Sequence, residues 1–502
     1  MPDVMKTLLL NPPSFEKFDG GASSRWPVAR EIESYWYPVW LTYAAGMLPG
    51  SRLLDACPHK IGPERTAQIS KDYDFAVVFT STVGFQSDLQ LIRRMKELKP
   101  ELKIALVGPH VQNRPDQSLQ ASEDIDFIVR GEFDYAVVEF AQGKPLAEIL
   151  GISYRQDGKV AHTPPRPQLH TEQLDALPFA TQVYQRDLVI ENYTVPFLLH
   201  PFVSLYTTRG CPALCTFCQW PQTISGHAWR VRSTDNVVRE IRQALEIFPQ
   251  AKELFFDDDT FNIRKDRAME ISAKFKPLKF RWSANARVHS DYETLKAMAE
   301  GGARLFIVGF ESGDAQILKN IKKGATVEMA RAFMKNCKKV GIKVHGDFII
   351  GLPGESRETI QRTIDFAKEL DCETIQVSLA HAFPGTELYN DLVRGNFLKA
   401  EALADSSGHQ LPHIEYPHLS RKEMMAGVNR FYDSYYFRPK VAWRIVREAL
   451  WDAHERKRLY HEAVQFLQLR AERLRWARKG PEKKPMVAVP AVGTGTGPVV
   501  QG

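Results

Sequence analysis

Short apolar segments, each about the length of one strand, alternate with helical segments along the chain, and this alternation limits the possible folds. In the first third of the chain these segments are 7–10, 52–54, 75–80, 103–107 and 126–129. This alternation predicts an α/β domain with a doubly wound, flavodoxin-like parallel sheet over residues 1–150. A cofactor crevice is expected at the carboxyl ends of its strands.

A second series of six strand-length segments follows, at 203–207, 253–257, 281–284, 304–309, 343–350 and 374–379. Well-marked helices separate them: residues 290–293 form a capping box, and Gly301 and Gly341 stand where helices end. The series predicts a partial (β/α)6 barrel over residues 196–400, whose active site lies at the carboxyl ends of the strands.

Three further segments complete the predicted organisation. Residues 151–195 contain the hairpin dipeptide Asp157-Gly158 and a Pro-rich run at 163–167, and are interpreted as a linker. Residues 401–480 are predicted to be a helical C-terminal region, and the Pro/Gly/Val-rich tail 481–502 is predicted to be disordered.

Charge and hydropathy exclude some classes of partner. The formal net charge is only +6, from 66 Lys+Arg against 60 Asp+Glu, so no nucleic-acid partner is expected. The N-terminal segment is not expected to be a signal peptide, and the sequence has no apolar stretch near the roughly 18 residues that span a bilayer. A cytoplasmic protein is therefore expected.

Three of the six cysteines are packed into the run Cys211-x3-Cys215-x2-Cys218, directly after the first strand of the second series. Such spacing is not typical of a disulfide framework and indicates metal binding in a reducing compartment. Three thiolates could bind three irons of a four-iron cluster and leave the fourth iron open. A zinc site is the alternative, with His227 as the nearby candidate for a fourth ligand.

A C-x3-C-x-aromatic-C run after a strand resembles the signature of the radical S-adenosylmethionine (SAM) superfamily. The resemblance implies a [4Fe-4S] cluster on Cys211, Cys215 and Cys218, with SAM bound to the open iron. Cleavage of SAM would then give a 5′-deoxyadenosyl radical. It also implies a reductant such as flavodoxin or ferredoxin.

The same resemblance implies roles for residues at other strand ends. Asp257 and Asp258 would hold the amino end of the methionine, and Glu311 would bind the ribose. Gly351, within the run 346–355, would let the backbone approach the adenine, which Phe217 would flank. Ser283, with Asn285 and Arg287, would complete the polar shell. The acidic run 257–259 could instead be a solvated turn with a helix cap.

The first domain resembles the cobalamin-binding domain of many radical SAM proteins, on residues 10–13, 108–110 and 130–132. The D-x-H-x-x-G element of that domain is absent, because Asp55 and His59-x-x-Gly62 are misplaced. Any bound cobalamin is therefore expected to have no histidine on cobalt. His59 and His110 are interpreted as loop or packing residues.

Residues 13–22 and 35–41 resemble the radical proteins of hopanoid biosynthesis. That resemblance implies a hopanoid lipid substrate, glucosaminyl-bacteriohopanetetrol, whose sugar ring is contracted to give a cyclitol ether. Five aromatic residues could line its pocket or simply belong to a buried helix: Tyr35, Trp36, Tyr37, Trp40 and Tyr43. Three C-terminal tryptophans could contact the inner face of the membrane peripherally or belong to a solvated helical cap: Trp443, Trp451 and Trp476.

Two other functions fit the same motifs. One is a cobalamin-dependent radical SAM methyltransferase that acts on an unactivated carbon. The other is a non-catalytic iron–sulfur binding module, which would have no need of the strand-end residues Asp257, Glu311 and Gly351.

Overall fold

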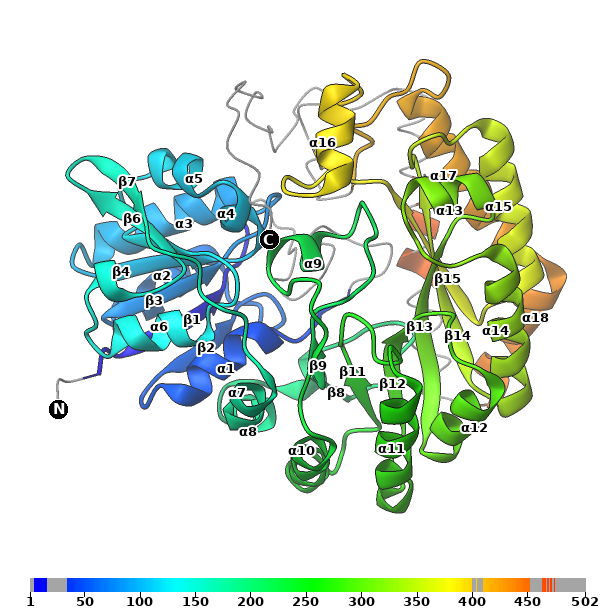
Figure 1. Cartoon of the computed structure of the whole chain (residues 1–502), viewed down its shortest axis with the longest axis horizontal. Helices are drawn as coiled ribbons and strands as arrows, with labels where there is room; N and C mark the ends of the chain where they lie inside the picture. The colour runs from blue at the N-terminus through cyan, green and yellow to red at the C-terminus, as the bar shows by residue number, and fades with distance from the viewer. Residues whose placement is uncertain are drawn as a thin grey trace.

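The computed structural model describes residues 4–15, 34–399, 403, 410–451, 463–465, 467–468, 470–471 and 474. The predicted disordered tail 481–502, most of the segment 13–22 and Trp476 lie outside these residues. Two α/β units follow each other along the chain, and in Figure 1 they lie on either side of the short helix α9 (Gln219–Thr223).

The first unit contains a seven-stranded sheet in the order β2-β1-β3-β4-β5-β6-β7. Its strands are β1 (Thr7–Asn11), β2 (Arg52–Asp55), β3 (Phe75–Phe79), β4 (Lys103–Val107), β5 (Phe127–Val129), β6 (Ile152–Gln156) and β7 (Lys159–His162). The first five strands are parallel. This order confirms the predicted flavodoxin-like sheet and places its switch point between β1 and β3.

The hairpin β6–β7 adds two antiparallel strands to the edge of the first sheet. Its turn is the expected Asp157-Gly158, and both residues have positive φ angles of 50° and 74°. Sequence analysis assigned this hairpin to the linker. It pairs with β5 because that edge would otherwise expose unpaired backbone groups.

Helices cover both faces of the first sheet, so alternate residues of each strand enter different cores. Leu9 belongs to one apolar cluster, whereas Leu8 and Leu10 belong to the other. The helices of this half of the chain are α1 (Val39–Met47), α2 (Pro63–Ser70), α3 (Phe85–Leu98), α4 (Pro109–Asn113), α5 (Pro115–Ala121), α6 (Asp134–Ala141), α7 (Thr171–Ala176) and α8 (Ala180–Asp187), with single turns at Leu146–Glu148 and Ile190–Asn192.

The second unit is a six-stranded, all-parallel sheet in the order β15-β14-β13-β12-β11-β8. It confirms the predicted partial barrel. The strands are β8 (Phe202–Leu205), β11 (Glu253–Phe256), β12 (Trp282–Ala286), β13 (Ala303–Glu311), β14 (Lys343–Ile350) and β15 (Thr374–Leu379). The helices between them are α10 (Thr234–Ile247), α11 (Lys265–Phe275), the turn Lys276–Leu278, α12 (Tyr292–Glu300), α13 (Ala315–Asn320), α14 (Val327–Val340) and α15 (Arg357–Leu370).

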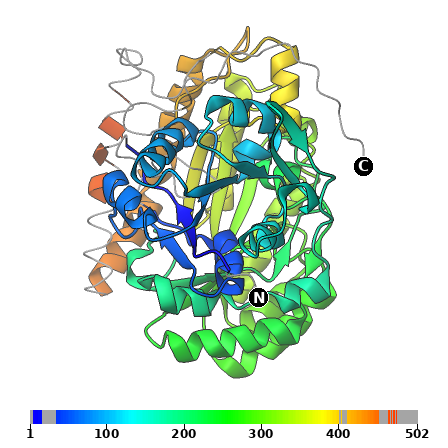
Figure 2. The same cartoon turned by 90° about the vertical axis from the view of Figure 1, so that its left-hand side faces the viewer.

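One apolar core is continuous across the two units, and α1 lies within it. Residues 39–45 of α1 are all buried, because the helix contacts β1, α6 and α8 together. Trp40 also stacks on Trp220 of α9, with ring centroids 6.1 Å apart. Figure 2, seen from the side of the first sheet, shows the first unit in front of the second sheet. The two units therefore pack as one body.

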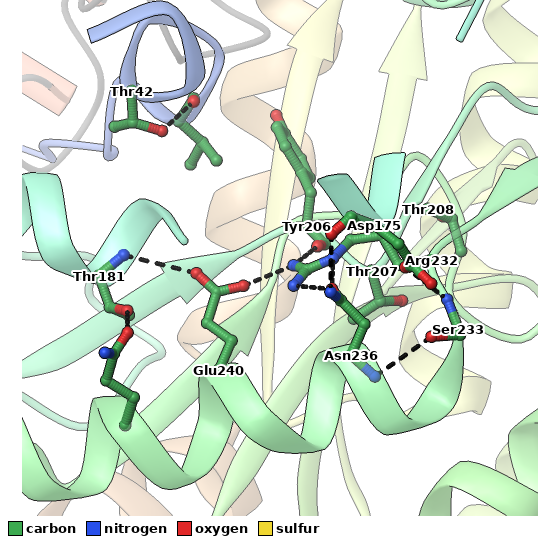
Figure 3. A network of polar contacts seen from close by, with 12 residues as sticks. Thr42, Asp175, Thr181, Tyr206, Thr207, Thr208, Arg232, Ser233, Asn236 and Glu240 are labelled. Atoms are coloured by element: carbon green, nitrogen blue, oxygen red, sulfur yellow. Dashed lines mark hydrogen bonds and ion pairs between the residues drawn. The ribbon is translucent and has the colours of Figure 1, made fainter. Parts of the chain in front are cut away.

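A buried polar network ties the linker helix α8 to the second unit (Figure 3). Arg232 donates to Glu240 at 2.5 Å and to the carbonyl of Tyr206 at 2.9 Å, and Thr181 N donates to the same Glu240 carboxylate at 3.4 Å. Because each partner is buried, the charges and amides must satisfy one another. The network fixes the backbone of Tyr206, whose side chain contacts the candidate site described below.

The helical C-terminal region begins after α16 (Glu387–Arg394) and is described for α17 (Arg421–Tyr436) and α18 (Pro439–Trp451). Helix α17 packs on α15, β14 and β15. Trp443 is 64% exposed on α18, whereas the side chains of Trp451 and Trp476 lie outside the described residues. Peripheral membrane contact stays a prediction. Among the described residues, no helix combines the length and apolarity needed to cross a bilayer.

Candidate active site

A cavity of about 310 Å³ lies at the carboxyl ends of the second sheet. It brings together six of the nine residues that the sequence nominated: Cys211, Cys215, Phe217, Cys218, Asp257 and Glu311. Asn285 and Arg287 line the same cavity. Asp258, Ser283 and Gly351 do not line it.

The cysteine loop is held by one side-chain amide. Gln222 of α9 donates to the carbonyls of Cys215 and Cys218 at 3.2 and 2.7 Å. Gly210 begins the loop with a φ of +85°, and a Cβ there would come within 2.2 Å of the Ala228 carbonyl oxygen. The loop is therefore shaped before any metal binds.

The three thiols on one loop are a donor set that suits a four-iron cluster. Within the described part of the chain, no three His, Cys, Asp or Glu side chains lie close enough together to hold one metal ion. A cubane spreads its thiolates, because each binds a different iron. His227, the candidate fourth ligand of a zinc site, instead bonds the Cys211 carbonyl at 3.1 Å through Nδ1.

Asp257 and Asp258 face different surroundings. Asp257 is 3% exposed, lines the cavity and accepts a hydrogen bond from Asn285 Nδ2 at 3.0 Å. Tyr206 lies on its other side, with Oη 3.5 Å from Asp257 Oδ2. Asp258 accepts from Thr207 N and Oγ1, both at 2.5 Å, and from Thr208 N at 3.0 Å. Asp258 thus fastens the end of β8 and does not face the cavity.

Glu311 ends β13 with a φ of +64° and is paired with a lysine that sequence reasoning missed. Lys323 Nζ lies 2.7 Å from Glu311 Oε1, and both residues are buried. Burial raises the pKa of Glu311, and Lys323 opposes that shift. Burial lowers the pKa of Lys323, but Glu311 and Cys215 together outweigh burial, so the net shift of this pKa is upward. Lys323 follows α13 in no recognisable motif, so no sequence signal identifies it.

Ser283 and Gly351 have structural partners away from the cavity. Ser283 donates to Glu253, which Arg304 also binds at 2.8 Å through Nε, near the amino ends of the strands. Gly351 has a φ of +96°, and a Cβ there would lie 3.1 Å from Met424 Sδ of α17. Its glycine serves a tight turn against the C-terminal helix.

Aromatic side chains also line the cavity. Phe197 stacks on His345 of β14 with ring centroids 3.9 Å apart, and Trp36 lies 6.3 Å from Phe197. Of the five aromatic residues near α1, Trp36 lines the cavity. Tyr37, Trp40 and Tyr43 are core residues, as the alternative interpretation held.

The carboxyl edge of the first sheet meets α9. Phe79, which ends β3, lies 6.4 Å from the Trp220 ring, and α4 contacts α9. Trp220 lines the cavity, and its indole Nε1 is buried without a hydrogen-bond partner among the described residues. A buried donor of this kind suits a bound group that supplies an acceptor. The thiols and carboxylates fit a cluster and SAM, and the sheet edge beside α9 fits cobalamin.

Comparison with known proteins identifies both units. Residues 205–367 match the Radical SAM superfamily model, and residues 25–141 match the B12 binding domain model. An uncharacterized methyltransferase of Pyrococcus horikoshii is 32% identical over 451 residues, which cover 87% of this chain and 94% of the relative. The cytidylyl-2-hydroxyethylphosphonate methyltransferase of Streptomyces wedmorensis is 29% identical over 66% of this chain and 70% of its own.

Among solved structures, the cobalamin-dependent SAM radical enzyme OxsB, with aqua-cobalamin and SAM bound, superposes with a TM-score of 0.67 at 15% identity. The match covers 93% of this chain and 72% of that one. It shows that the order of the two units and the helical C-terminal region form a common fold.

These comparisons correct the expected reaction. The contraction of a hopanoid sugar ring is wrong as the function, because the two relatives described above, which align over 87% and 66% of this chain, are named methyltransferases. The segment that carried the hopanoid resemblance is short, and most of residues 13–22 lie outside the described structure. A short local likeness cannot outweigh an alignment of 451 residues.

The family assignment settles the cofactors. The two matched domains imply a [4Fe-4S] cluster, SAM and cobalamin, together with a reductant. With three thiols in one cavity and a B12-type sheet packed beside it, the chain belongs to the radical SAM superfamily, in the group that carries a B12 binding domain ahead of the radical SAM domain.

Proposed function

We propose that the chain is a cobalamin-dependent radical SAM methyltransferase that acts on an unactivated carbon. One observation carries the proposal: the carboxyl edge of the B12-type sheet lies against the cysteine loop, through Phe79 and Trp220 and through α4 and α9. A methyl carrier at that edge and a radical source on the loop would be neighbours. The names of the two curated relatives support the same reaction class.

When bound, the cofactors supply a radical that removes a hydrogen atom and a methyl group that replaces it. The chain's own residues would hold and orient these groups. The thiolates of Cys211, Cys215 and Cys218 bind the cluster. Asp257, fixed by Asn285, presents a carboxylate to the methionine ammonium. Lys323 pairs with Oε1 of Glu311 and favours the charged carboxylate, and the other carboxylate oxygen would accept hydrogen bonds from the ribose hydroxyls.

The rest of the cavity would receive the substrate. Trp36 and Phe197 form an apolar wall that excludes water from a carbon radical. Polar side chains on the neighbouring strands β14 and β15, including Asp347 and Ser378, would orient the molecule. Backbone register places these strands side by side, with Asp347 opposite Gln376. The cavity therefore suits a substrate with both apolar and polar parts.

The test uses SAM with a deuterated methyl group, anaerobic holoenzyme, a strong reductant and a small-molecule extract. We expect both S-adenosylhomocysteine and 5′-deoxyadenosine, with the first dependent on added cobalamin, and a product heavier by the labelled methyl. The Cys337→Ala variant is the matched control, because Cys337 lies on α14 and does not line the cavity, so this variant should behave as the parent enzyme. Formation of 5′-deoxyadenosine alone, with or without cobalamin, would contradict methyl transfer.

A further inference from the structure

Arg287 is fixed at both ends beside the cysteine loop. The side-chain amide of Asn262 makes two hydrogen bonds to its backbone: Asn262 Oδ1 accepts from Arg287 N at 2.8 Å, and Asn262 Nδ2 donates to Arg287 O at 2.7 Å. At the other end, Arg287 Nη2 donates to the carbonyl of Lys323. The guanidinium is thus held in place before a cluster is bound.

The guanidinium is directed at one sulfur in particular. Arg287 Nη1 lies 3.7 Å from Cys215 Sγ, within reach of a hydrogen bond to sulfur. Cys211 Sγ instead has a neutral neighbour, Thr260 Oγ1 at 3.6 Å. The other cation of the cavity, Lys323, is engaged by Glu311 at 2.7 Å. The thiolates therefore lie in unequal electrostatic surroundings.

A charged donor beside a cluster ligand changes the energy of reduction. Reduction transfers one electron from an external one-electron donor to the cluster, breaks no bond and adds one negative charge. A guanidinium hydrogen bonded to a thiolate stabilises that added charge, strongly so where water is excluded. Hydrogen bonds to the sulfurs are a recognised control of cluster potentials.

We infer that Arg287 is a positioning residue that raises the reduction potential of the cluster through a charge-assisted hydrogen bond to Cys215. This inference depends on the cluster and not on the proposed methyl transfer. By easing reduction, Arg287 would make cluster reduction accessible to a cellular reductant.

The test is a potentiometric titration of the reconstituted Arg287→Gln variant, followed by electron paramagnetic resonance without SAM or substrate. At a fixed potential we expect the ratio of reduced to oxidised cluster to fall about tenfold, which corresponds to a midpoint roughly 59 mV lower for one electron. The control is Arg264→Gln, which removes the same charge from an exposed arginine paired with Asp266. Its midpoint should equal that of the parent.

An Arg287→Gln protein that holds full iron and sulfide and has an unchanged midpoint overturns the inference. If this variant does not retain the cluster, Arg287→Met decides, because it removes the charge and the hydrogen-bond donor and keeps an apolar side chain of similar length. A lowered midpoint in the loaded Met variant supports the inference, and an unchanged one overturns it. Absence of methyl transfer would leave these potentials unaffected, so the two proposals fail separately.

Discussion

The two parallel sheets present their carboxyl ends to the same region and use them differently. At the edge of the first sheet the polar side chains bond one another: Asn11 donates to Asp55 at 2.6 Å, and Thr80 donates to Asp88 at 2.5 Å. At the edge of the second sheet Asp257, Glu311 and the thiols converge on a cavity. The edge of the first sheet is therefore a surface whose polar groups are already hydrogen bonded, and a large cofactor can lie on it. The other edge offers individual ligand groups.

This difference explains why the individual ligand groups are concentrated in one half of a molecule with two α/β halves. A surface satisfied by its own hydrogen bonds tolerates the loss of one side chain, whereas a cluster needs each of its thiolates. Substitutions at the two edges should therefore have effects that differ in type as well as in magnitude.

The largest effect is expected at the cysteine loop. Replacing Cys211, Cys215 or Cys218 singly by Ala should abolish activity and lower bound iron and sulfide, because each thiolate binds its own iron. Cys57, Cys337 and Cys372 should be dispensable for the cluster. Iron and sulfide analysis with visible absorbance after anaerobic reconstitution measures this. A fully loaded, active triple variant of the loop would disprove the cluster assignment.

A large loss of stability is expected at the junction between the two halves. Arg209, directly before the cysteine loop, forms a bidentate pair with Asp134 at 2.7 and 2.9 Å, and both side chains are at most 3% exposed. Asp134→Ala should cost about 3 kcal/mol, because it removes both hydrogen bonds and leaves the buried Arg209 charge opposed by Glu132, whose Oε1 lies 3.5 Å away. Urea unfolding measures the change.

The matched control for the junction is Asp266→Ala, which breaks the exposed pair with Arg264. Its unfolding midpoint should stay close to that of the parent, because water replaces the lost partner. Equal midpoints for the two variants would show that the halves do not depend on the buried pair.

A smaller, pH-dependent effect is expected at the edge of the first sheet. Burial lowers the pKa of His110 to about 3, and its ring packs at a tilt against Phe85 with centroids 4.2 Å apart. The unfolded chain takes up a proton near pH 6.5 and the folded chain does not, so this group costs stability as pH falls from about 6.5 towards 3.

The loss from one such histidine is at most about 1.4 kcal/mol per pH unit. His110→Gln should flatten the fall in unfolding free energy between pH 6 and pH 4, measured by urea titration at each pH. The same slope in parent and variant would mean that His110 does not contribute.

The smallest effect is expected at His59. Its Nδ1 lies 2.8 Å from the Asp55 carbonyl, and its Nε2 accepts from Val189 N at 3.1 Å, so the backbone occupies both nitrogens. His59→Ala should leave the visible spectrum of bound cobalamin unchanged. A spectral shift would show that a histidine approaches cobalt after all, and that the first edge supplies a ligand as the second does.

The function could not be predicted in full from local motifs. The cysteine spacing and the two βα series identified the superfamily, the fold and the cofactors. The predicted ring contraction was wrong, because it was based on the resemblance of residues 13–22 and 35–41 alone. Of these segments, Tyr37 and Trp40 proved to be core residues that pack the two units together. Aromatic residues dominate cores and binding sites alike, so their presence does not distinguish the two.

By itself the sequence determined the strands, their parallel order and the loop that carries the three thiols, because periodicity and glycine positions are local properties of the chain. Only the tertiary structure decided which strand-end side chains meet. Asp257 faces the cavity while Asp258 turns back to Thr207, although the two are adjacent. Lys323 reaches back to Glu311 from the loop that follows α13. These choices depend on packing between segments far apart in sequence, which no local pattern encodes.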